Sequence, residues 1–298
     1  MFGRRVDGKR VKNIDPIVRI TPYLMPMRCD AQVFLQHKLD YEKLARYIAK
    51  KNREGEKITF MQIIMAAYVR AVSQNPQVNR FVFNKQYYIR NNCSAAYAVL
   101  KDPQDNESAE TTVRIEFDLT DTLFDVRDRM NDAVEKARAT EDGDFVIRLA
   151  SAVLAVPGLP TVIVALYKLI DRYGLAPKVI VKQLPFYSGL FMTNNASIGL
   201  NHVLHHIYNF GSVGIFMAMG NTMKEAVTDS EGKVRMKRWL PLGLTADERV
   251  CSGAHYSAFF ADVTRFMDNP ELLETPPEQV FFDENVEYHV PKVRKTEA

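Results

Sequence analysis

The chain has 298 residues, of which 47% are hydrophobic and 25% charged, enough for one large domain or two small ones. This composition is typical of a folded globular protein and excludes a disordered or collagen-like chain. The net charge of +3 gives no indication of nucleic-acid binding, which usually requires a concentrated basic face.

The three cysteines, Cys29, Cys93 and Cys251, lie far apart and form no CxxC pair. They predict no disulfide framework, and a reducing cytoplasm is the expected location. The basic N-terminus is not followed by an apolar run, so it does not resemble a secretory signal.

Apolar periodicity predicts alternating helices and strands after an irregular, proline-spaced segment at residues 1–30. Thr59 and Gln62 form a capping-box pattern that predicts the start of one helix. The expected strands are 32–39, 86–90, 94–100, 111–117, 187–193, 214–219 and one or two within 234–244; the expected helices are 41–53, 59–74, 123–137 and 254–267.

This order predicts a single α/β domain whose sheet is mostly mixed or antiparallel and flanked by helices. We divide the chain into a basic N-terminal segment (1–16), the domain (17–273) and a polar C-terminal tail (274–298). Nucleotide-binding and hydrolase motifs such as GxGxxG and GxSxG are absent.

Residues 149–167 carry no charge, a length that could just cross a bilayer. Pro157-Gly158-Leu159-Pro160 should break a helix in the middle of this segment. We therefore expect an insertion at about 145–175 made of two short apolar helices, buried in the fold or at a subunit interface. Membrane contact through 149–167 is the alternative.

Residues 244–253 read LTADERVCSG. This stretch resembles D-H-R-x-x-D-G, a motif of the dihydrolipoyl acyltransferases, which share a catalytic domain with the chloramphenicol acetyltransferases. Asp247, Arg249 and Gly253 match the motif, whereas Glu248 stands in place of its histidine and Ser252 in place of its second aspartate. Other segments resemble family motifs in the same order, namely 40–44, 60–79, 191–194, 211–220 and 269–273.

The resemblance implies a chloramphenicol-acetyltransferase-like fold and a homotrimer with active sites between subunits. It also implies acyl transfer between coenzyme A and an acceptor. In the family the histidine acts as general base, and a serine or threonine hydroxyl donates to the tetrahedral oxyanion. Thr193 matches that donor, and Asn194 and Gly253 are the positions expected to contact coenzyme A, which is a substrate here.

The replacement of the histidine leaves three hypotheses for the base. Glu248 itself can act, because burial in an apolar tunnel raises the pKa of a carboxyl group. Another histidine can substitute, either His255 or the pair His205 and His206. In the third hypothesis the site is inactive and the fold serves binding. Ser252 cannot ionise but can cap the helix that follows.

No metal site is expected, because the closely spaced His202, His205 and His206 have no cysteine or further carboxylate nearby. The lipoyl and subunit-binding domains of complex-forming relatives are also not found, so no covalently bound lipoyl group is expected. The sequence thus predicts a free-standing CoA-dependent acyltransferase with a small-molecule hydroxyl or thiol acceptor. The alternative is an inactive trimeric binding or scaffold protein, one version of which is associated with a membrane.

Overall fold

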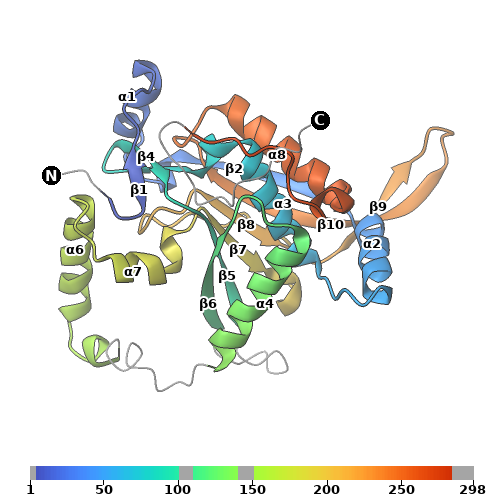
Figure 1. Cartoon of the computed structure of the whole chain (residues 1–298), viewed down its shortest axis with the longest axis horizontal. Coiled ribbons are helices and arrows are strands. Elements are labelled where there is room, and N and C mark those ends of the chain that lie inside the picture. Colours follow the sequence, from blue (N-terminus) through green and yellow to red (C-terminus); the bar gives the residue numbers. More distant parts are fainter. Residues whose placement is uncertain (1–4, 101–109, 140–150, 284–298) are drawn as a thin grey trace.

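The computed structural model describes residues 5–100, 110–139 and 151–283, and Figure 1 shows their arrangement. Helices in these ranges are α1 (Pro16–Leu24), α2 (Tyr41–Arg53), α3 (Phe60–Gln74), α4 (Leu123–Ala139), α6 (Leu159–Arg172), α7 (Lys178–Gln183) and α8 (Gly253–Asp268). Strands are β1 (Gly8–Arg10), β2 (Gln32–Asp40), β3 (Arg80–Phe83), β4 (Gln86–Arg90), β5 (Cys93–Leu100), β6 (Glu110–Phe117), β7 (Leu190–Asn194), β8 (Ile215–Met219), β9 (Met223–Thr228) and β10 (Val234–Asp247).

The large sheet has the strand order β2-β10-β8-β7-β5-β6, with β9 paired to the outer half of β10. β7 runs parallel to both β5 and β8, whereas the other neighbouring pairs are antiparallel. The predicted α/β class with a mixed sheet flanked by helices is therefore confirmed.

The two faces of this sheet are covered differently (Figure 1). Helices α3, α4 and α8 pack on one face, where Leu190 and Met192 of β7 join the main core. Because successive strand residues point to opposite faces, Phe191 lies on the other face, packed with Ile207 and Val213. That outer face is therefore covered in part by the loop that precedes β8.

A second, three-stranded sheet has the order β1-β4-β3. β3 and β4 form a hairpin whose two-residue turn, Asn84-Lys85, has positive φ at both residues (46° and 60°). This is the backbone that two-residue hairpins favour, since its twist matches that of the strands.

Most predicted elements are confirmed, and the Thr59–Gln62 capping box is present at the start of α3. The expectation of an irregular segment at residues 1–30 is wrong, because β1 and α1 lie there. The short strands β3 and β9 were not predicted. β10 is one continuous strand that extends to Asp247, three residues beyond the predicted end at 244.

The apolar segment breaks where the prolines and glycine predict, with a helical turn at 151–154 before α6; residues 149 and 150 lie outside the described ranges. Of the two expected locations, burial within one chain is not found, because Val162, Leu166 and Leu169 of α6 are exposed. A location at a subunit interface stays a prediction. No helix among the described residues combines the length and apolar character needed to span a bilayer.

Candidate functional site

The loop after β10 is fixed by a buried ion pair between Asp247 and Arg249. The Asp247 carboxylate accepts from the Arg249 backbone N–H (3.1 Å), Nε (2.8 Å) and Nη2 (2.7 Å). The Arg249 Nη1 in turn donates to the Met25 carbonyl at 3.0 Å. Both charged side chains are almost inaccessible to solvent, so these bonds hold the loop in one conformation.

Arg28 is a third member of this cluster. Its Nε lies 3.8 Å from Asp247 Oδ2, and its Nη1 donates to the Tyr208 carbonyl at 3.1 Å. Burial lowers the pKa of Arg28 to about 10, an effect that the Asp247 charge opposes. Sequence reasoning missed Arg28, because it is remote from Asp247 along the chain and has no motif around it.

Glu248 lies between the two members of the Asp247–Arg249 pair and is exposed. Its backbone N–H donates to the Ala31 carbonyl at 2.9 Å, which fixes its main chain against the start of β2. The carboxylate is therefore presented to solvent from a rigid support.

Ser252, Gly253 and His255 form the start of α8. The Ser252 hydroxyl caps the helix, as the sequence predicts, and its Oγ lies 2.6 Å from His255 Nδ1. Both side chains are exposed. A Cβ built on Gly253 meets no heavy atom within 4 Å, so local packing does not require a glycine there.

Thr193 and Asn194 are at the C-terminal end of β7. By strand alternation, Thr193 points to the same outer face as Phe191, away from the helices. The Thr193 Oγ1 and the Asn194 Oδ1 are both buried without a hydrogen-bond partner in the described part of the chain. Such unsatisfied buried groups are uncommon and call for a functional or structural reason.

The sheet register separates Thr193 from Glu248. Thr193 pairs with Ala218 of β8, and Ala218 pairs with Gly243 of β10. Glu248 is five residues further along the chain, about 17 Å at roughly 3.4 Å per residue, and two strand spacings of about 4.8 Å separate β7 from β10, so the two residues lie on the order of 20 Å apart. One chain therefore does not bring these two predicted site residues together.

The histidines considered as substitutes have different neighbours, and His205 and His206 stack on each other at 4.5 Å between ring centroids. His255 is beside Ser252, whereas the His205 ring stacks on Phe216 of β8 at 4.0 Å between centroids. Phe216 also stacks on Phe191, so His205 shares the outer face with Thr193. In the described ranges no cluster of histidine, cysteine and acidic residues has the arrangement of a metal site.

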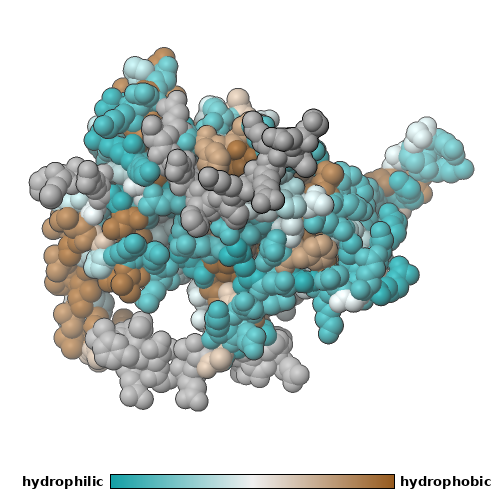
Figure 2. Space-filling model, in the orientation of Figure 1, coloured by the Kyte–Doolittle hydropathy of each residue, from teal (hydrophilic) through white to brown (hydrophobic). Residues whose placement is uncertain are grey.

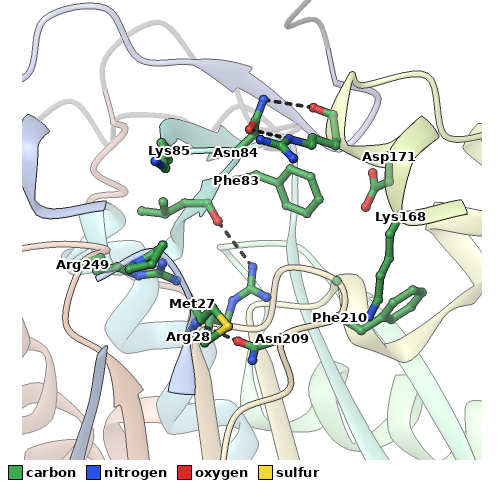
Figure 3. Close-up of a pocket in the computed structure, with 14 residues that line it drawn as sticks. Met27, Arg28, Phe83, Asn84, Lys85, Lys168, Asp171, Asn209, Phe210 and Arg249 are labelled. Atoms are coloured by element: carbon green, nitrogen blue, oxygen red, sulfur yellow. Dashed lines mark hydrogen bonds between the residues drawn. The ribbon is translucent and has the colours of Figure 1, made fainter. Parts of the chain in front are cut away.

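A basic pocket of about 340 Å³ adjoins the Asp247 loop. Figure 3 shows Lys168 reaching towards it from α6 and Arg28 from the other side. Its remaining charged lining residues are Lys85, Arg172, Arg249 and Asp171. Arg28 and Arg249 share the Asp247 carboxylate, and Asp171 pairs with Arg5. The excess positive charge of the lining therefore comes from Lys85, Lys168 and Arg172, and it favours an anionic occupant.

A smaller, mainly apolar cavity of about 90 Å³ lies between the sheet and α8. His37 of β2 lines it, with its Nε2 3.3 Å from the Thr264 Oγ1. Burial lowers the pKa of His37, and the Asp268 charge opposes that effect.

Comparison with known families identifies a match over residues 188–275, to the family described as 2-oxoacid dehydrogenases acyltransferase (catalytic domain). This region contains β7, β8, β10 and α8, and therefore the supports of both Thr193 and Glu248. The resemblance expected from the sequence is confirmed for this part of the chain. No curated protein sequence matches the chain.

Solved structures with the same fold include the cubic core of a pyruvate dehydrogenase multienzyme complex, with a TM-score of 0.56 and 13% identity over 88% of this chain and 93% of that one. A probable dihydrolipoamide acetyltransferase from Listeria monocytogenes has a TM-score of 0.55 and 12% identity, covering 94% of this chain and 99% of its own. A chloramphenicol acetyltransferase has a TM-score of 0.52 and 11% identity, covering 87% and 99%. At these identities the likeness shows a shared fold.

Proposed function

We propose that this protein is a CoA-dependent acyltransferase that moves an acyl group between coenzyme A and a small hydroxyl or thiol acceptor. The observation that carries the proposal is the buried Thr193 Oγ1, which has no hydrogen-bond partner in the described structure. It lies on a strand within the region that matches an acyltransferase catalytic domain. An oxyanion donor needs such a hydroxyl, fixed and not already engaged.

In the proposed reaction the Glu248 carboxylate takes the proton from the acceptor hydroxyl or thiol as that atom attacks the thioester carbonyl carbon. Thr193 donates a hydrogen bond to the oxyanion of the tetrahedral intermediate. Collapse of the intermediate breaks the carbon–sulfur bond, and the departing coenzyme A thiolate recovers the proton from Glu248. Asn194 and Gly253 are placed, by resemblance, against coenzyme A.

The separation of Thr193 and Glu248 within one chain supports a site shared between two copies. In the cyclic homotrimer that we propose, Glu248 of one subunit projects from its Asp247–Arg249 support towards Thr193 of the next. The exposure of Glu248 in the single chain agrees with this arrangement, because a heterologous interface pairs different surfaces of two copies. Ser252 and His255 then line the edge of the same interface.

The test is turnover of acetyl-CoA by the purified protein, measured by loss of thioester absorbance with dihydrolipoamide or chloramphenicol as acceptor. Glu248→Gln is expected to lower the rate by about 10²–10⁴-fold, whereas Glu231→Gln, an exposed glutamate of the β9–β10 hairpin, keeps it. His205→Asn tests the alternative base. An unchanged rate in the Glu248 variant removes Glu248 from the mechanism, and absence of both turnover and CoA binding refutes the proposed function.

A further inference from the structure

An exposed apolar stripe runs along α6. Val162, Leu166, Leu169 and Tyr173 have exposed fractions of 63%, 55%, 51% and 45%. At about 100° per residue these four positions fall on one side of the helix and its C-terminal cap. Figure 2 shows hydrophobic residues gathered over α6 and α7, against a mostly hydrophilic remainder of this view. A monomer surface of this kind usually marks an interaction site.

The opposite side of α6 anchors the helix to the body of the protein. Asp171 is buried and lies 2.9 Å from Arg5 Nη1, and it accepts a hydrogen bond of 2.5 Å from the Tyr187 hydroxyl. Tyr167 meets the same tyrosine at 3.1 Å between hydroxyl oxygens. The polar side chains Tyr167 and Asp171 of α6 therefore contact the body of the protein, and the apolar stripe faces away from it.

The charges around the stripe have one sign. Residues 151–184 contain the basic residues Lys168, Arg172, Lys178 and Lys182 and a single acidic residue, Asp171. Asp171 is neutralised by Arg5 on the buried side, whereas the four cations are exposed. On the helical wheel Lys168 and Arg172 flank the stripe on one side. An apolar stripe edged by cations is the pattern of helices that lie in a membrane interface.

The basic pocket lies beside this surface, because Lys168 and Arg172 of α6 line it together with Lys85 and Arg28 (Figure 3). A pocket of about 340 Å³ has room for a phosphate group and part of the molecule that carries it. The pocket and the cations around the stripe thus offer the same chemistry, namely binding of phosphate anions next to an apolar surface.

We propose that α6 lies in the surface of a membrane that contains anionic phospholipids, with its apolar stripe among the acyl chains and a headgroup phosphate in the basic pocket. The 14 residues of α6 fall short of the roughly 20 needed to cross a bilayer, so the helix lies along the interface. A second copy of the chain suits this surface less well, because the chain carries a net charge of +3 and brings no overall negative charge to a cationic surface. The proposal does not depend on the acyl-transfer reaction.

The test is co-sedimentation of the full chain with vesicles of phosphatidylcholine, with and without about one third phosphatidylglycerol. We expect at least about tenfold tighter binding to the anionic vesicles, and loss of most of that binding in Leu166→Glu/Leu169→Glu. The matched control is Val234→Glu/Met236→Glu, which changes residues that are 70% and 61% exposed on the β9–β10 hairpin and should bind like wild type.

A second variant pair tests the cations. Lys168→Gln/Arg172→Gln should weaken binding to anionic vesicles by roughly fivefold for each cation removed and leave binding to neutral vesicles unchanged. Wild-type protein that binds neither vesicle, or both equally, overturns the proposal. A Leu166→Glu/Leu169→Glu protein that binds vesicles like wild type also overturns the proposal. If the only change in this variant is a smaller mass of the assembly in light scattering, the surface belongs to a contact with a second copy.

Discussion

Replacement of Asp247 by alanine should destabilise the protein strongly, because this carboxylate neutralises two buried guanidinium groups. The substitution removes the three hydrogen bonds to Arg249 and the 3.8 Å contact with Arg28. Both arginines are about 95% buried, so each would keep its charge with little water and with no carboxylate counter-ion among the residues that the structure describes. Breaking a buried pair in this way costs about 3–5 kcal/mol.

The assay is urea unfolding of Asp247→Ala and wild type at one fixed protein concentration, since association changes apparent stability. Glu231→Ala is the control, because it breaks an ion pair with Lys233 whose partners are 72% and 77% exposed. That change should cost no more than about 0.5 kcal/mol. A loss below about 1 kcal/mol for Asp247→Ala would show that the loop is not held by this buried pair.

Three further changes test the local structure. Gly211→Ala should destabilise the protein by more than about 2 kcal/mol in the same assay, because φ is +76° and a Cβ would lie 2.2 Å from the Phe186 carbonyl oxygen; a neutral effect would contradict that backbone. Thr59→Ala should cost about 0.5–2 kcal/mol through loss of the α3 cap, and retention of wild-type stability would mean that the cap is not formed. The pKa of His37 is lower in the folded protein than its unfolded value of 6.5. Its contribution to stability is therefore present above pH 6.5 and is lost as pH falls through the folded pKa. The free energy of unfolding should change by at most about 1.4 kcal/mol per pH unit over this range. His37→Leu should flatten the pH dependence of unfolding over that range, and an identical dependence in the variant would refute this assignment.

The elements that sequence reasoning placed well carry their own local signals. α3 begins at a capping box and is followed by Asn75-Pro76, and these features depend on nearby residues only. α1 was missed because the prolines spaced along residues 1–30 suggested an irregular segment. In fact Asp15 caps the helix through the Ile17 N–H at 2.8 Å, and Pro16 takes the first helical position, where its missing donor costs nothing. Pro22 lies inside the helix, beyond the first turn, so the same reason does not apply to it.

The candidate site was only partly predictable because its parts depend on tertiary geometry. The Asp247–Arg249 pair is local and falls within a recognisable motif, whereas Arg28 reaches Asp247 only through the fold. The distance between Thr193 and Glu248 follows from strand order and register, which periodicity does not specify. Likewise, the apolar composition of α6 indicated burial, and only the packing of Asp171 and Tyr167 shows which side faces outward.

The central claim, that Glu248 and Thr193 from different copies form one acyltransferase site, is tested most directly by complementation. Glu248→Gln and Thr193→Val proteins, each expected to lose at least about a hundredfold in acetyl-CoA turnover, are mixed in equal amounts, unfolded and refolded together. Random assembly pairs an intact Glu248 with an intact Thr193 in about one quarter of shared sites. Recovery of about a quarter of wild-type turnover is predicted, and a mixture as inactive as its components would contradict the claim.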